Sequence, residues 1–210
     1  MNNLFSFDKK LGIVIGTDEA GRGPAAGGVF ASCVYFPEIN SNLKKLLERL
    51  NDSKKLKKSA REDLYEIIIN NSVNSTVCIE VEEIEKINIL NSSLKAMKIA
   101  CENVIKQANL KDFLTIIDGN RLIKNYTYPQ KFIIKGDGKS ASIAAASILA
   151  KVTRDRYMDK LSQKFPMYGW EHNVGYLTKE HLDAIDKYGL CKYHRPSFLK
   201  KHFEKQLTLF

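Results

Sequence analysis

The chain has 210 residues and a mass of 23.8 kDa, enough to bury a sizeable core without disulfide or metal support. Hydrophobic residues make up 44% and charged residues 27% of the chain, a composition that excludes intrinsic disorder. Its 33 Lys and Arg against 24 Asp and Glu give a formal charge of +9. This surplus favours a polyanionic partner such as nucleic acid, although a generally lysine-rich surface would give the same sum.

The sequence predicts neither membrane insertion nor secretion. Its longest apolar run, residues 143–150, is far shorter than the roughly 20 residues of a membrane-spanning helix. The first ten residues lack the basic-then-apolar order of a signal peptide. The four cysteines contain no CxxC pair, which argues against a zinc site and fits a reducing compartment. We therefore expect a cytoplasmic protein.

In chain order, the first half predicts strands at residues 11–17 and 29–36, joined by a loop rich in glycine and proline. Apolar residues at three-four spacing predict helices at 42–50 and 59–70. An alternating strand at 75–81 and a helix at 92–108 follow.

The second half predicts strands at 113–117 and 130–135, then helices at 140–164 and 178–187 that begin after the N-caps Ser140 and Thr178. Because strands come first and then alternate with helices, we expect an α/β fold with a mixed central β-sheet flanked by helices. From residue 189 onward the pattern predicts a small helical C-terminal appendage.

Acidic residues follow three of the predicted strands. Asp18 and Glu19 come after the first strand, Asp118 after the fourth and Asp137 just after the fifth. Neighbouring strands lie about 5 Å apart, so pairing of these strands would bring the carboxylates together. Such carboxylates repel one another unless cations lie between them, and an all-oxygen ligand set suits Mg²⁺ or Mn²⁺. Two such ions can hydrolyse a phosphodiester, so in a basic protein the pattern indicates a nuclease.

Longer motifs are spread along the chain in a fixed order. They are GTDEAGRGP at residues 16–24, DSKKL at 52–56, KGDGKS at 135–140, IAAASILAKVTRD at 143–155, GYxT at 175–178 and HRxSF at 194–198. Together they resemble the signature of the type 2 ribonucleases H, the bacterial ribonuclease HII family. The resemblance implies an RNase H-like fold and metal-dependent endonucleolytic cleavage of RNA strands paired to DNA. It also implies two Mn²⁺ or Mg²⁺ ions per site, held by the same four acids that follow the predicted strands.

The resemblance further implies a way of recognising the substrate. Gly21, Arg22 and Gly23 would present backbone groups to a ribose 2′-hydroxyl, and Tyr176 would pack against the sugar at an RNA-to-DNA junction. Glycine permits such close backbone approach, and the 2′-hydroxyl distinguishes RNA from DNA, although GRG alone would be read as a tight turn. The expected cut lies 5′ to a ribonucleotide, in hybrids and at single ribonucleotides in duplex DNA, and leaves a 3′-hydroxyl and a 5′-phosphate.

Basic and hydroxyl side chains near these motifs predict contacts to backbone phosphates. These side chains are Ser53, Lys54 and Lys55 in the DSKKL segment, Lys139 after Asp137, and Arg154 on the following helix. We expect them to line the groove that holds the nucleic acid.

The last five residues, QLTLF, resemble the peptide that docks into the bacterial sliding clamp. Gln206 would supply hydrogen bonds while Leu207, Leu209 and Phe210 fill an apolar groove of the clamp. The alternative is that these hydrophobic residues fold back onto their own domain. We expect a monomer with a catalytic domain at 1–188, an extension at 189–205 contributing to the substrate groove, and this tail at 206–210.

Two other functions share part of this pattern. Another RNase H-fold nuclease, such as a junction resolvase, would use the same acids but has no need to recognise a 2′-hydroxyl. A protein that only binds hybrids would lack at least one of the four acids, and all four are present.

Overall fold

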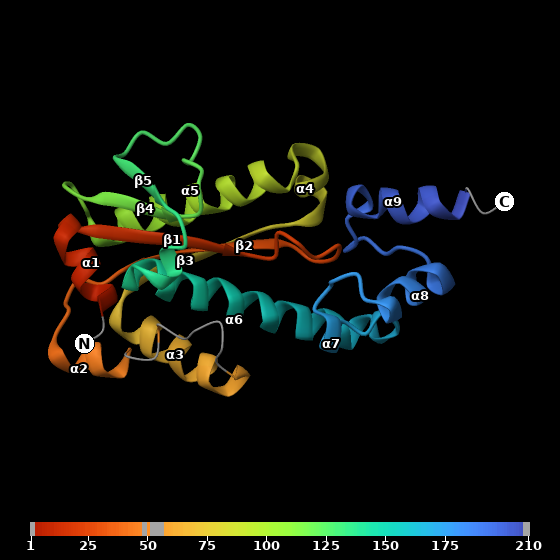
Figure 1. Cartoon of the computed structure of the whole chain (residues 1–210), viewed down its shortest axis with the longest axis horizontal. Helices are drawn as coiled ribbons and strands as arrows, with labels where there is room; N and C mark the ends of the chain where they lie inside the picture. Colours follow the sequence, from red (N-terminus) through yellow and green to blue (C-terminus); the bar gives the residue numbers. More distant parts are fainter. Residues whose placement is uncertain (1–2, 48–49, 51–56, 208–210) are drawn as a thin grey trace.

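A twisted sheet forms the centre of the computed structural model, which describes residues 3–47, 50 and 57–207 (Figure 1). Its strands are β1 (Val14–Ala20), β2 (Val29–Tyr35), β3 (Val73–Ile79), β4 (Leu114–Asp118) and β5 (Gln130–Ile133), in the spatial order β3-β2-β1-β4-β5. The β1–β2 and β2–β3 pairs are antiparallel, whereas the β1–β4 and β4–β5 pairs are parallel. The predicted α/β class with a mixed sheet is therefore confirmed.

Helices cover both faces of this sheet. One face is covered by α4 (Val81–Ile87) and α5 (Ile89–Ala108), and the other by α1 (Asn3–Leu11), α2 (Ser41–Leu46), α3 (Lys58–Asn71) and α6 (Ala141–Lys164) (Figure 1). Strand β2 shows why both faces are buried. Ala31 and Cys33 pack with the α5 core, whereas Val34, on the opposite face, packs with α6. The two cores hold the sheet rigidly between them.

The long helix α6 passes beneath the strand that carries the first two acids. Its N-cap is Ser140, as predicted, because the Ser140 hydroxyl accepts a hydrogen bond from the Ile143 N–H at 3.2 Å. The buried carboxylate of Asp8 on α1 accepts both the N–H and the hydroxyl of Ser142 at 2.9 Å. A carboxylate at this end also complements the helix dipole. Among the described helices, none is long and apolar enough to cross a membrane.

The C-terminal part packs against the far end of α6 and the loop between β1 and β2. It comprises the short helices η3 (Pro166–Tyr168) and α7 (Trp170–Asn173), followed by α8 (Lys179–Tyr188) and α9 (Pro196–Leu207). A third apolar cluster joins Trp170 and Leu199 to Met158 of α6 and to Ala25 and Ala26 of the loop. The predicted N-cap of α8 is also observed, since the Thr178 hydroxyl accepts from the His181 N–H.

Some element boundaries differ from the sequence prediction. Residues 3–11 form a helix, whose Leu4 and Phe5 lie in the α6-side core, so the first strand begins later than predicted. That strand continues to Ala20 because Ala20 still pairs with Phe30 of β2. Asp18 and Glu19 consequently lie within the strand rather than after it. Helix α4 was not predicted at all.

Candidate active site

The sheet register places the acids of β1 and β4 next to each other. Thr17 of β1 pairs with Ile117 of the parallel strand β4, so the following residues, Asp18 and Asp118, lie side by side. Asp118 in turn pairs with Ile133, the last residue of β5. Asp137 follows on the single-turn helix η2 (Gly136–Gly138). The four predicted acids thus come from one end of three adjacent strands.

Hydrogen bonds within the protein orient three of these carboxylates. Oδ1 of Asp18 accepts the Glu19 N–H at 2.7 Å, and the Ser147 hydroxyl of α6 donates to the same carboxylate. Oδ1 of Asp118 accepts the Gly136 N–H at 2.6 Å, which ties β4 to the turn that carries Asp137. Glu19 receives a hydrogen bond from the exposed Arg22 side chain at 3.0 Å.

Burial and mutual repulsion disfavour the charged forms of the two acids on β1. Burial, followed by the charges of Glu19 and Asp118, raises the pKa of Asp18 well above its usual range. Burial also raises the pKa of Glu19, against the opposing effect of Arg22. Apart from Arg22, the protein therefore provides little positive charge to keep these two carboxylates ionised. This is the environment that a divalent cation stabilises.

The donor set fits Mg²⁺ or Mn²⁺. It consists of carboxylate oxygens, which these hard cations prefer. Three such groups do not yet converge on a single point among the described residues, and neither do His or Cys donors. Asp18, Glu19, Asp118 and Asp137 are the residues that would hold the ions.

A glycine-rich loop, residues 21–28, joins β1 to β2 beside these acids. Gly21 has φ +98°, and a Cβ there would lie 2.3 Å from Nε of Arg154, so any other residue would strain the backbone and displace the Arg154 side chain. A Cβ on Gly23 would lie 3.3 Å from the Tyr176 ring. Tyr176 itself is 53% exposed. The structure therefore brings together the GRG motif and Tyr176, which are about 150 residues apart in sequence.

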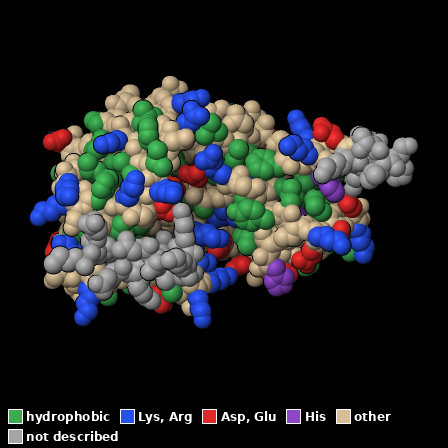
Figure 2. Space-filling model, in the orientation of Figure 1, with side chains coloured by type: hydrophobic (Ala, Val, Ile, Leu, Met, Phe, Trp, Pro, Cys, Tyr) green, Lys and Arg blue, Asp and Glu red, His purple; other side chains and the backbone are tan. Residues whose placement is uncertain are grey.

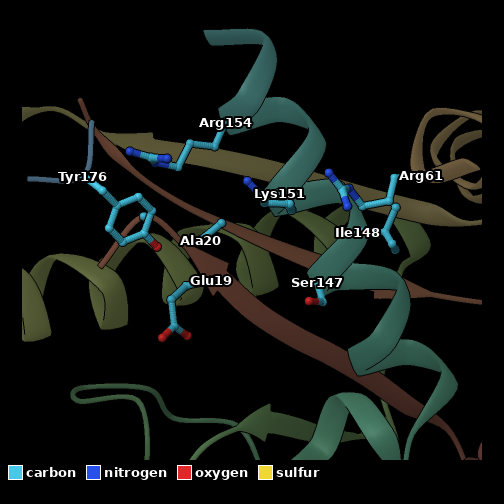
Figure 3. Close-up of a pocket in the computed structure, with 9 residues that line it drawn as sticks. Glu19, Ala20, Arg61, Ser147, Ile148, Lys151, Arg154 and Tyr176 are labelled. Carbon is cyan, nitrogen blue, oxygen red and sulfur yellow. The ribbon is translucent and has the colours of Figure 1, made fainter. Parts of the chain in front are cut away.

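A pocket of about 320 Å³ lies between the loop and α6 (Figure 3). It is lined by Glu19, Ala20 and Gly21 from the β1 side, by Arg61 of α3, by Ser147, Ile148, Lys151 and Arg154 of α6, and by Tyr176. Arg61 and Lys151 both face Asp155, at 4.0 Å for Arg61, so their charges are shared with that carboxylate. Figure 2 shows Lys and Arg side chains on both sides of acidic side chains near the middle of the sheet.

A buried histidine pair holds the backbone of Tyr176. Trp170 Nε1 donates to His181 Nε2 at 3.0 Å, so the proton of His181 lies on Nδ1 and is donated to the Tyr176 carbonyl at 2.9 Å. The Cys191 N–H donates to His194 Nδ1, which leaves His194 Nε2 to donate to His181 at 3.2 Å. Burial lowers the pKa of both histidines, that of His194 to about 4, so both are neutral. No spacing in the sequence indicated this pair.

The predicted phosphate-binding residues have different outcomes. Ser53, Lys54 and Lys55 lie outside the described residues. Lys139 is exposed two positions after Asp137, where a phosphate contact remains a prediction. Arg154 requires a correction: its side chain is only 2% exposed, and Nη2 donates to the carbonyls of Ala26 and Val174 at 3.2 and 3.1 Å. Arg154 thus contributes to the wall of the pocket while its Nη2 holds the protein backbone.

Sequence reasoning missed Ser147 because it lies within the apolar run of residues 143–150. The sequence did contain a signal, namely a single hydroxyl side chain among alanines and isoleucines, in the helix that crosses β1. For the tail, Gln206 and Leu207 end α9, but their side chains, and residues 208–210 with Leu209 and Phe210, lie outside what the structure describes.

A sequence model of one protein family covers nearly the whole chain: that of ribonuclease HII matches residues 15–206. The chain belongs to the ribonuclease HII family. The ribonuclease HII of Fusobacterium nucleatum is 46% identical over 206 residues, which cover 98% of this chain and 94% of that protein. The ribonuclease HII of Rickettsia akari is 49% identical over 198 residues, 93% and 97% of the two chains. The protein is therefore a ribonuclease H, an endoribonuclease acting on RNA paired to DNA in a metal-dependent reaction.

Solved structures show the same fold. Ribonuclease H2 from Pyrococcus horikoshii superposes with a TM-score of 0.73 at 28% identity, covering 91% of this chain and 97% of that chain. The ribonuclease HII of Archaeoglobus fulgidus, solved in complex with PCNA, has a TM-score of 0.70 at 23% identity, with 87% and 93% covered. Bst-RNase HIII in complex with Mn²⁺ has a TM-score of 0.66 at 18% identity, with 87% and 65% covered. The predicted RNase H-like fold is confirmed.

Proposed function

We propose that this ribonuclease H incises 5′ to single ribonucleotides in duplex DNA, in addition to cleaving the RNA strand of RNA–DNA hybrids. The observation that carries the proposal is the shared pocket of Glu19, Gly21 and Tyr176, in which a tyrosine ring packs against Gly23 next to the acids. A backbone loop and an exposed ring suit one ribose, because neither depends on the base sequence. The acids lie where the phosphodiester beside that ribose would enter.

The glycine-rich loop and Tyr176 contact different parts of the ribonucleotide. Backbone groups of residues 21–23 face the 2′-hydroxyl, and glycine at both ends lets the sugar approach closely. The Tyr176 ring covers the sugar at the junction with the next deoxynucleotide. Together they select a ribonucleotide without contacting its base.

For the chemistry, Asp18, Glu19, Asp118 and Asp137 would hold two Mg²⁺ or Mn²⁺ ions. When bound, such a pair of ions would supply the Lewis acidity for phosphodiester hydrolysis, which would leave a 3′-hydroxyl and a 5′-phosphate. The Ser147 hydroxyl orients Asp18, and the Gly136 N–H orients Asp118.

Further parts of the proposal rest on the sequence and on composition. Ser53, Lys54, Lys55 and Lys139 contact phosphates, and residues 189–205 extend the groove beside a catalytic domain at 1–188. The protein acts as a monomer in the cytoplasm, a location supported by its four free cysteines. The tail at 206–210 docks on a sliding clamp; the Archaeoglobus relative was solved with PCNA, which supports a partner of this kind.

Cleavage of a labelled DNA duplex containing one ribonucleotide tests the central proposal. We expect a nick 5′ to the ribonucleotide with Mg²⁺ or Mn²⁺ and none with chelator. Asp118→Asn keeps the acceptor for the Gly136 N–H, so the variant should fold. Loss of a residue that only hydrogen-bonds to a metal ligand lowers activity up to roughly 100-fold. Because Asp118 is proposed as a ligand itself, the cleavage rate of Asp118→Asn should fall by more than that. Asp112→Asn, an exposed acid before the same strand, is the matched control.

Two results would count against the proposal. Cleavage of long hybrids alone would leave the metal site intact but remove the ribonucleotide-reading role of the loop and Tyr176. Unchanged turnover in the Asp118→Asn variant would remove Asp118 from the metal site.

A further inference from the structure

The glycine-rich loop is attached to the C-terminal part of the chain by a short backbone ladder. The Ala25 N–H donates to Gly175 at 2.9 Å, and the Gly27 N–H donates to Tyr193 at 2.8 Å. In return the Arg195 N–H donates to Ala25 at 2.7 Å. The loop is thus held between the turn that carries Tyr176 and a segment almost 170 residues away in sequence.

The Arg195 side chain reinforces this ladder from within. It is fully buried, and its donors are directed at backbone carbonyls of the loop. Nε and Nη2 both donate to Gly27, at 2.9 and 2.6 Å, and Nη1 donates to Pro24 at 2.8 Å. A longer contact of 3.5 Å joins Nη1 to the carbonyl of Arg22, in the GRG motif itself. One rigid guanidinium therefore fixes the relative positions of three loop carbonyls.

Burying the Arg195 guanidinium costs electrostatic free energy. Stabilisation of the fold therefore does not by itself explain why a charged side chain occupies this position. Burial, and then the charge of nearby Arg154, lower the pKa of Arg195 to about 10. Arg154 is itself buried and donates to Ala26, so two guanidinium groups lie beneath one short loop. Apolar residues of similar volume often stabilise a protein more than buried charges do. A planar fork of donors, however, sets geometry that neither an apolar residue nor lysine can set.

We propose that Arg195 is a positioning residue that sets the backbone of residues 21–23 for recognition of the ribose 2′-hydroxyl. This inference rests on the proposed function of the loop. Arg195 lies beneath the loop and acts through it without touching substrate. The acids are anchored separately, by the sheet and by Ser147 and Gly136. Loss of the Arg195 fork should therefore weaken the preference for a ribonucleotide more than it weakens the metal site.

The test is a thermodynamic cycle of binding affinities, in which one change is the Arg195 substitution and the other is removal of the 2′-hydroxyl from the probe. Binding is measured in chelator, without cleavage, to a duplex with one ribonucleotide and to the same duplex made of DNA alone. The ratio of the two affinities isolates the contribution of the 2′-hydroxyl. For Arg195→Lys we expect this ratio to fall about tenfold, the loss expected for one hydrogen bond. The surface variant Arg156→Lys, whose side chain is 42% exposed, should keep the wild-type ratio.

Each outcome has a separate meaning. No ribonucleotide preference in the wild type would refute the proposed function of the loop. A wild-type preference that Arg195→Lys retains would refute the role of Arg195. If Arg195→Lys does not fold, Arg195→Met, which removes the buried charge, is measured in the same way. If neither variant folds, Arg195 is required for folding and the positioning role is refuted.

Discussion

Gly21 carries two constraints at one position. Its backbone has φ +98°, and a Cβ would overlap Nε of Arg154. For Gly21→Ala we expect cleavage to fall at least about tenfold and stability to fall by more than the roughly 1–2 kcal/mol of left-handed strain. Gly12→Ala isolates the strain, since Gly12 has φ +87° with nothing within 4 Å. Cleavage assays and denaturant unfolding compare the two variants. Equal losses in both would show that the contact with Arg154 is unimportant.

Individual residues differ in how well the sequence indicates their positions. The four acids were predictable because strand ends and sheet pairing bring them to one place. Arg154 and Arg195 were not, since a basic residue in a basic protein suggests the surface. Their burial depends on loop carbonyls that no local pattern reveals. Ser147 was hidden for the opposite reason, because it lies in an apolar run.

At the scale of elements, the histidine pair between α8 and the segment before α9 makes the fold sensitive to acid. His194 has a pKa of about 4 in the folded protein against 6.5 ordinarily, and that of His181 is also lowered. Between these values the unfolded chain binds more protons, so stability rises with pH. We expect the free energy of unfolding to fall as the pH drops from about 6.5 towards 4, as measured by denaturant titration.

The control for this prediction is a histidine in solvent. His194→Gln should flatten the pH dependence in that window, whereas His172→Gln, at a side chain that is 76% exposed, should leave it unchanged. An identical slope in His194→Gln and the wild type would contradict the assignment of the acid sensitivity to this pair.

Element boundaries were predictable where a local signal marks them. Ser140 and Thr178 cap α6 and α8 through their own hydroxyls, a contact that needs only neighbouring residues. Helices α1 and α4 were missed because they are short, with nine and seven residues, and α1 is stabilised by tertiary contacts such as that of Asp8 with Ser142. The extension of β1 to Ala20 likewise depends on its partner strand.

At the scale of the whole molecule, the proposed clamp contact of the tail can be tested separately from cleavage. Deleting residues 206–210 should leave cleavage of short duplexes unchanged, because the four acids and the residues that line the pocket all precede this segment. It should abolish binding to a sliding clamp, measured by surface plasmon resonance with the full chain as reference. Substituting Lys200 and Lys201 by Gln, with the tail kept, is the control for a general charge effect. Equal clamp affinity with and without the tail would refute the docking proposal.

The ladder between the glycine-rich loop and Arg195 has a consequence for synthesis on the ribosome. All four carboxylates, and the residues of all five strands, have been translated by residue 137. Chains of this kind emerge at about 5–20 residues per second, so seconds pass before residue 195 is added. During that interval the loop after β1 lacks the guanidinium that fixes it. A growing chain therefore contains all four acids seconds before it contains the side chain that anchors the glycine-rich loop.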